Sequence, residues 1–124
     1  MISIIDDDQS VRLAAKRLFK SLGYATATFT SAEEFLESGC LRDTQCLISD
    51  VQMPGMSGVD LQCHLVQNGC CPPMIFVTAF SEENVRKRAL EAGAYGFLKK
   101  PFREESLMAC LDEALKGHKI ESST

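Results

Sequence analysis

The sequence at positions 46–58 is Cys46-Leu47-Ile48-Ser49-Asp50-Val51-Gln52-Met53-Pro54-Gly55-Met56-Ser57-Gly58. An apolar run ends there in a carboxylate, and turn residues follow at once, which predicts a strand that delivers one acid to the edge of a sheet. Other chemically active side chains also stand directly after short apolar runs. They are Asp6, Asp7, Asp8, Thr78 and Lys100. The shared placement predicts that these groups meet at one edge.

The rest of the chain repeats a strand-like run and a helical pattern five times. Apolar runs at 2–5, 24–29, 47–49, 74–77 and 95–98 predict strands, and helical spacing predicts helices at 9–22, 31–38, 58–66, 81–92 and about 103–116. Strict alternation favours an α/β fold, a five-stranded parallel sheet with helices on both faces, because parallel neighbours need crossover connections. A central first strand flanked by the third would place Asp7 beside Asp50, at the edge where such sheets bind ligands.

Composition restricts the classes of function. With 124 residues the chain is one domain, and its net charge of -4 argues against direct nucleic-acid contact, which depends on clustered Lys and Arg. No apolar run approaches the length of a membrane span, and residues 1–15 do not resemble a signal peptide. The six cysteines contain no C-x-x-C spacing and are expected to be reduced thiols. We therefore expect a cytoplasmic protein without a membrane partner.

The residues gathered at the predicted edge suit phosphoryl chemistry. Clustered carboxylates repel one another unless a cation lies among them, and oxygen ligands without His or Cys favour a hard ion such as Mg2+. Lys100 adds a fixed positive charge and Thr78 a hydroxyl donor. In that setting an aspartate can take up a phosphoryl group as an acyl phosphate. Asp50 is the best candidate because it stands alone at its strand end, whereas Asp6 and Asp7 form a pair suited to holding metal.

Each residue also has an ordinary explanation. The acids at 6–8 could merely favour the positive N-terminal end of the first helix, a role we expect for Asp8. Asp50 could be a turn residue, and Thr78 alone is unremarkable at a strand end. Only their joint occurrence at the ends of several strands favours a site. Two helices also have capping signals at their starts. Ser31 with Glu34 predicts a capping box, and Ser81 could cap the fourth helix.

The chain resembles the receiver domain of bacterial two-component response regulators. The motifs that carry the resemblance are Ile-Ile-Asp6-Asp7-Asp8, the stretch from Asp50 to Gly58, Val77-Thr78-Ala79, Gly93-Ala94 and Lys100-Pro101-Phe102. They span Ile2 to about Leu115. The resemblance implies a flavodoxin-like fold with strand order 2-1-3-4-5 and transfer of a phosphoryl group from a partner histidine kinase to Asp50. It implies a phosphoacceptor that catalyses its own phosphotransfer and dephosphorylation, not a turnover enzyme.

The same resemblance implies a ligand set for Mg2+. Asp7 and Asp50 would bind the ion directly, together with the backbone carbonyl of Gln52, and Asp6 would act through water. The positions of Gln52 and Phe80 tune the rate of dephosphorylation in this family. Because a bulky apolar Phe80 could hinder the attacking water, we expect slow loss of the phosphoryl group, which a Phe80→Glu variant would test.

The resemblance also implies a switch. Thr78 and Lys100 would contact the phosphoryl oxygens, and the Lys100-Pro101 bond would be cis, a form that only an X-Pro bond makes inexpensive. Thr78 and Phe97 correspond to the switch pair, in which the hydroxyl moves toward the phosphoryl group and the aromatic ring turns inward. That change would bias the surface of the fourth helix, fifth strand and fifth helix toward a partner or a second copy.

We expect the receiver domain to occupy residues 1–116, with 117–124 a polar tail or the start of a linker. Family members usually carry an output domain, and the motif style favours transcription regulation through a DNA-binding helix-turn-helix domain outside this chain. Two rival hypotheses remain. In a haloacid-dehalogenase-type phosphatase, Asp6 would be the nucleophile and Asp8 the acid. A receiver-like docking module would act without phosphorylation.

Overall fold

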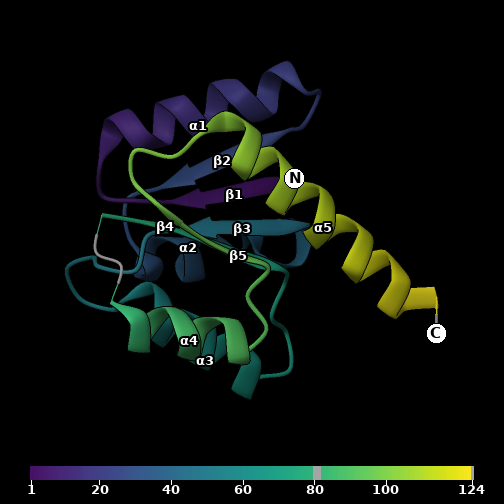
Figure 1. Cartoon of the computed structure of the whole chain (residues 1–124). Helices are drawn as coiled ribbons and strands as arrows, with labels where there is room; N and C mark the ends of the chain where they lie inside the picture. Colours follow the sequence, from purple (N-terminus) through teal and green to yellow (C-terminus); the bar gives the residue numbers. More distant parts are fainter. Residues whose placement is uncertain (80–81, 124) are drawn as a thin grey trace.

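Five parallel strands form the centre of the molecule. The computed structural model describes residues 1–79 and 82–123, with side chains described through residue 116. The strands are β1 (Ile2–Ile5), β2 (Thr26–Phe29), β3 (Cys46–Ser49), β4 (Met74–Thr78) and β5 (Gly96–Lys99). They pair in the order β2-β1-β3-β4-β5, and every pair is parallel (Figure 1). This confirms the predicted fold.

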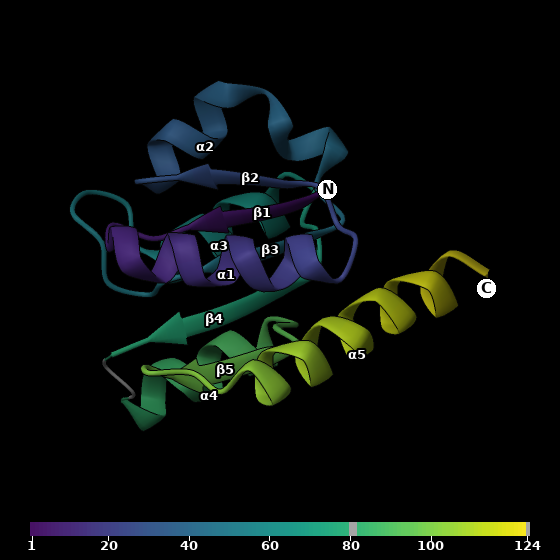
Figure 2. The ribbon, with the colours of Figure 1, turned by 90° about the horizontal axis from the view of Figure 1, so that it is seen from above.

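Helices cover both faces of the sheet, as the alternation predicts (Figure 2). They are α1 (Gln9–Ser21), α2 (Ala32–Ser38), α3 (Gly58–Gln67), α4 (Glu83–Glu91) and α5 (Glu104–Ser123), with a short 3-10 helix at Cys40–Asp43. One buried cluster packs α1 and α5 against the sheet through residues such as Phe19 and Leu107. A second cluster packs α2, α3 and α4 through Phe35, Leu61 and Ala89. The sheet therefore has a hydrophobic core on each face.

The central strands are apolar because both of their faces are buried. Along β3, Cys46 and Ile48 belong to the cluster under α1 and α5, whereas Leu47 belongs to the cluster on the opposite face. All four residues of β3 are buried. Such a strand reads as a continuous apolar run rather than an alternating one. The apolar run ends at the buried Ser49, and the carboxylate of Asp50 follows it at the edge of the sheet.

The starts of the helices show which of the predicted capping residues cap a helix in the structure. Asp8 caps α1, and its carboxylate accepts a hydrogen bond from the Ser10 N–H at 2.9 Å. Ser31 caps α2, but the capping box is open, because the Glu34 carboxylate accepts from the Thr30 hydroxyl at 2.6 Å instead. The expected cap of α4, Ser81, lies outside the described residues. The first two caps are decided by contacts within four residues.

The end of α5 differs from the prediction. We expected the helix to stop near Lys116, and it continues to Ser123, beyond the body of the domain (Figure 2). The segment after Lys116 contains no proline, and its single glycine lowers helix propensity without forbidding a helix. Residues 117–123 are thus helical and not an irregular tail. Within the described residues, none of the helices has the length and apolar character needed to cross a membrane.

Candidate functional site

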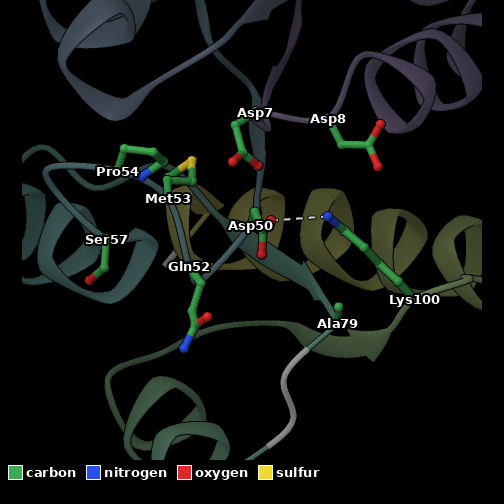
Figure 3. Close-up of a pocket in the computed structure, with 9 residues that line it drawn as sticks. All are labelled: Asp7, Asp8, Asp50, Gln52, Met53, Pro54, Ser57, Ala79 and Lys100. Carbon is green, nitrogen blue, oxygen red and sulfur yellow. Dashed lines mark hydrogen bonds and ion pairs between the residues drawn. The ribbon is translucent and has the colours of Figure 1, made fainter.

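The ends of β1 and β3 bring three acids together. The two strands are neighbours with Ile5 opposite Ser49, and the Asp50 N–H donates to the Ile5 carbonyl at 3.0 Å. Asp6 and Asp7 therefore leave the sheet beside Asp50. One carboxylate oxygen from each of the three acids lies within 4.8 Å of the others. In Figure 3 the carboxylate of Asp7 points toward Asp50, while Asp8 is turned away.

Lys100 completes the cluster from the end of β5, two strands away from β3 in the sheet. Its N–H donates to the Thr78 carbonyl at 2.8 Å, which places the residue at the end of β5. The ammonium nitrogen lies 2.9 Å from Asp50 Oδ2 and 2.9 Å from Asp6 Oδ2 (Figure 3). All three side chains are largely buried, with 15% of Lys100, 2% of Asp6 and 7% of Asp50 exposed. The peptide bond between Lys100 and Pro101 is cis.

Burial and charge set the protonation of this cluster. Burial raises the pKa of Asp6, although hydrogen bonds from the Asp8 N–H and from Lys100 partly oppose the shift. Burial alone would lower the pKa of Lys100, but its hydrogen bonds to Asp6 and Asp50 and their charges outweigh burial and raise it. Lys100 is therefore an ammonium at neutral pH. Hydrogen bonds from the Ser10 hydroxyl and N–H lower the pKa of Asp8.

The carboxylate of Asp50 is only half satisfied. Its Oδ2 accepts from Lys100, whereas Oδ1 is the one buried side-chain oxygen or nitrogen that lacks a hydrogen-bond partner among the described residues. A buried polar atom without a partner costs about 1–3 kcal/mol. An arrangement of three clustered carboxylates with an unpaired oxygen fits a hard divalent ion such as Mg2+. Asp6, Asp7 and Asp50 could hold it.

Asp7, Asp50 and Lys100 form part of the wall of a cavity of about 700 Å³. The loop that follows Asp50 lines the opposite side through Gln52, Met53, Pro54 and Ser57. Figure 3 shows that the side chain of Gln52 extends away from the carboxylates, so that its amide does not approach Asp7 or Asp50. The cavity leaves room at the acids for an ion and a small group.

The two residues expected to form the switch lie on adjacent strands. Thr78, the last residue of β4, is fully buried. Phe97 in β5 is half-buried, and its ring centroid is 6.0 Å from that of Phe76. Both belong to adjacent strands that end at the acidic edge, so that only one strand, β4, separates a change at Asp50 from β5. Phe80, on which the expectation of slow dephosphorylation depends, lies outside the described residues.

Two contributors to the site were missed in the sequence. The Arg12 guanidinium, one turn into α1, donates to the Asp6 carbonyl at 2.6 Å and fastens the acidic turn. Gly58 begins α3 in contact with the strand end, since a Cβ there would collide with the Asp50 carbonyl oxygen. The glycine that follows the Asp50 loop was a visible signal for the second contact. The first depends on the direction of a long side chain, which spacing does not determine.

The fold and the site define a class: flavodoxin-like α/β domains whose acidic sheet edge pairs clustered aspartates with a lysine. Residues 2–112 match the profile of the family described as response regulator receiver domain. The chain belongs to this family, and it is a receiver domain of two-component signalling.

Curated relatives agree with this assignment. The response regulator protein TodT of Pseudomonas putida is 40% identical over 116 residues, which cover 94% of this chain and 51% of TodT. Nodulation protein W of Bradyrhizobium diazoefficiens is 38% identical over 108 residues, which cover 87% of this chain and 48% of the relative. The chain thus spans about half the length of these relatives.

Solved structures give the same result. The response regulator StyR is 36% identical with a TM-score of 0.89, and the match covers 98% of this chain and 62% of StyR. The structure described as FixJ-N is 30% identical with a TM-score of 0.81, and the match covers 93% of this chain and 92% of that chain. Chemotaxis protein CheY4 of Vibrio cholerae, 27% identical, has a TM-score of 0.80 over 92% of this chain and 97% of CheY4.

Proposed function

We propose that Asp50 accepts a phosphoryl group from a histidine kinase and that the domain uses it as a signal. One observation carries the proposal. The Asp50 carboxylate, only 7% exposed, has Oδ2 held by Lys100 at 2.9 Å and Oδ1 without a partner, at the wall of an open cavity. The large majority of buried side-chain oxygens in folded proteins have a hydrogen-bond partner, so the unpaired Oδ1 favours a ligand-binding role over a purely structural one. Asp6 and Asp7 stand beside it and could hold a metal ion.

The transfer exchanges an N–P bond for an O–P bond. An Asp50 oxygen attacks the phosphorus of a phosphohistidine, an O–P bond forms, and the N–P bond breaks with its electron pair returning to the imidazole nitrogen. Asp7, Asp50 and the backbone carbonyl of Gln52 would hold Mg2+, which would supply positive charge to offset the charge on the equatorial oxygens. Lys100, which stays an ammonium, turns from Asp50 to the phosphoryl group. Attack by water on phosphorus later restores the carboxylate and releases phosphate.

Labelling by a small phosphodonor tests the proposal. The protein is incubated with phosphoramidate and Mg2+, and intact mass is measured. We expect one added phosphoryl group in the wild type, none in Asp50→Asn, and one in the control Asp43→Asn, which changes an exposed acid outside the site. If Asp50→Asn were labelled like the wild type, the proposal would fail.

Phosphorylation would act through a population shift. The hydroxyl of Thr78 would move toward the phosphoryl group, and Phe97, half-buried in this structure, would turn further inward. These movements would change the surface formed by α4, β5 and α5, which a second copy of the domain could recognise. The position of both residues on neighbouring strands that end at the acidic edge supports this coupling.

The output of the whole protein is a further proposal. The relatives include transcriptional regulatory proteins such as TdiR of Thauera aromatica and FixJ of Azorhizobium caulinodans, and the chain spans about half of each. We infer that a DNA-binding domain outside this chain completes the regulator, with residues 1–116 as the receiver and α5 leading from 117 onward toward the output. The six free cysteines support a reducing compartment, the cytoplasm.

The rival hypotheses have less support. In a phosphatase with Asp6 as nucleophile, Asp8 would be the acid, but Asp8 caps α1 and points away from the cluster (Figure 3). Asp6 is also almost fully buried and paired with Lys100, so that an incoming phosphate ester has little access to it. A docking module without phosphorylation would not need the half-satisfied carboxylate of Asp50. The labelling experiment separates all three.

A further inference from the structure

The loop between Asp50 and α3 is fastened at its base by its own segment. The Gly58 N–H donates to the Val51 carbonyl at 2.9 Å, and the Ser57 N–H donates to the Asp60 carboxylate at 3.2 Å. These bonds fix the point at which the chain enters α3. They do not reach the outer part of the loop, residues 52–56, of which Gln52, Met53 and Pro54 line the cavity beside the acids.

A side chain from a different helix holds that outer part. Glu33, in the first turn of α2, accepts a hydrogen bond from the Met56 N–H at 3.0 Å, although the two residues are 23 positions apart. The neighbouring Gly55 has a φ of 81°, and a Cβ at that residue would collide with Glu33 Oε2. The glycine therefore lets the carboxylate lie directly against the loop backbone. A charged acceptor makes such a bond stronger than a neutral one.

The base of Glu33 is rigid. Ala32, directly before it in the helix, and Phe35, two positions after it, are fully buried in the core on that face of the sheet. The Ser31 hydroxyl accepts from the Glu34 N–H at 3.0 Å and fixes the start of the same helix. The backbone of Glu33 is thus anchored to the core, and its exposed carboxylate reaches the Met56 N–H from that anchored position.

We propose that Glu33 is a positioning residue for the metal and phosphoryl site. By holding the Met56 N–H it keeps the loop in the conformation in which Gln52 lines the cavity together with Asp7 and Asp50. This inference rests on the proposed function, since it concerns the same site. Without the bond the loop samples other conformations, and the apparent affinity for the ion falls in proportion to the fraction that remains competent.

Mg2+ titration by calorimetry tests the inference. We expect Glu33→Ala to weaken Mg2+ binding by about fivefold. Glu33→Gln should stay within about twofold of the wild type, because its amide oxygen can still accept from Met56. The matched control is Glu37→Ala, an exposed glutamate one turn further along α2, which should bind like the wild type. Asp7→Asn serves as the variant that loses binding.

Two further readouts distinguish positioning from general stability. Exchange of the Met56 amide in metal-free protein should be faster in Glu33→Ala and unchanged in Glu33→Gln, while Tm stays close to that of the wild type because Glu33 is exposed. In Glu33→Ala, phosphoramidate should label Asp50 more slowly than in the wild type at low Mg2+. At saturating Mg2+ the rate should recover, because excess ion selects the competent conformation of the loop.

The outcomes separate the two proposals. If Glu33→Ala binds Mg2+ like the wild type, the positioning role is wrong and the phosphoacceptor proposal stands. If Glu33→Gln is as weak as Glu33→Ala, the charge of Glu33 and not its hydrogen bond matters, and the positioning role is again wrong. If the wild-type protein binds no Mg2+, both proposals fail.

Discussion

Lys100 and Asp50 are 50 positions apart in the sequence, yet the lysine ammonium lies 2.9 Å from Asp50 Oδ2. The contact exists because β5 and β3 are parallel strands of one sheet whose carboxyl ends share an edge, with only β4 between them. The same ammonium lies 2.9 Å from Asp6 Oδ2. A single cation therefore balances two buried carboxylates, which leaves the cluster with a net negative charge that a divalent ion can offset.

Removing the charge of Lys100 should destabilise the metal-free protein. Lys100→Gln leaves Asp6 and Asp50 buried without their cation, so we expect the free energy of unfolding to fall by about 2 kcal/mol in the presence of a chelator. Mg2+ should restore most of the loss, because the ion replaces the missing charge. Urea titrations with and without Mg2+ measure both effects. Lys99→Gln, at an exposed neighbour, is the control, and an equal loss there would contradict the account.

The raised pKa of Asp6 predicts how stability depends on pH. Because the pKa of Asp6 in the folded protein lies above its ordinary value of 3.8, the native state binds more protons than the unfolded chain between these two values. The stability of metal-free protein therefore falls as pH rises through that interval, and at neutral pH the ionised Asp6 is a net cost. Asp6→Asn should remove this fall and raise Tm in chelator at pH 7 by about 3 °C.

Thermal unfolding from pH 3 to pH 7 checks this expectation. The exposed Asp43→Asn serves as control and should follow the wild type. A Tm for Asp6→Asn below that of the wild type at neutral pH would show that the pairing with Lys100 outweighs burial, contrary to the shift described here. With Mg2+ present the order should reverse, because the wild type gains more from the ion.

Gly58 should tolerate no side chain. A Cβ at this position would collide with the Asp50 carbonyl oxygen and lie 3.0 Å from the Phe76 ring. Since a backbone atom cannot move aside cheaply, we expect Gly58→Ala to lower the free energy of unfolding by about 2 kcal/mol and to slow labelling of Asp50. Gln67→Ala, at the exposed end of the same helix, should change neither quantity. If Asp50 in Gly58→Ala were labelled at the wild-type rate, the close approach of Gly58 to the Asp50 carbonyl oxygen would be dispensable.

The cysteines should divide into reactive and unreactive groups. Cys46 is fully buried in β3, and burial raises the pKa of its thiol to about 12. Iodoacetamide at pH 8 should therefore leave Cys46 unmodified in the folded protein, because the thiolate is the nucleophile. The exposed Cys63 and Cys70 should react. Peptide mapping after labelling checks this result, with unfolded protein as the control in which all six react. Rapid native labelling of Cys46 would contradict the packing of β3.

Much of this structure could be predicted from sequence patterns alone. The alternation of apolar runs and helical spacing predicted the five parallel strands, because buried parallel strands have no polar face to obscure the pattern. The turn residues after Asp50 predicted an acid at the sheet edge, and the structure places Asp6, Asp7 and Lys100 beside it. Local helix caps such as Asp8 could also be predicted from the sequence.

Other features depend on contacts between distant segments. The hydrogen bond from Arg12 to the Asp6 carbonyl and the one from Met56 to Glu33 follow from how helices sit on the sheet, which spacing does not determine. The Glu34 carboxylate accepts a hydrogen bond from the Thr30 hydroxyl and does not form the predicted capping box with the Ser31 N–H. The sequence pattern does not decide between these two nearby donors. The extension of α5 was missed because polar residues are as compatible with an exposed helix as with a linker.

The most direct test of the central claim is to find the residue that carries the phosphoryl group. Protein labelled by phosphoramidate and Mg2+ can be reduced with borohydride, which converts an aspartyl phosphate to homoserine, and then mapped by tandem mass spectrometry. The account predicts homoserine at position 50 alone. Homoserine at position 6 would favour the phosphatase hypothesis, and the absence of any converted aspartate in labelled conditions would contradict the phosphoacceptor role.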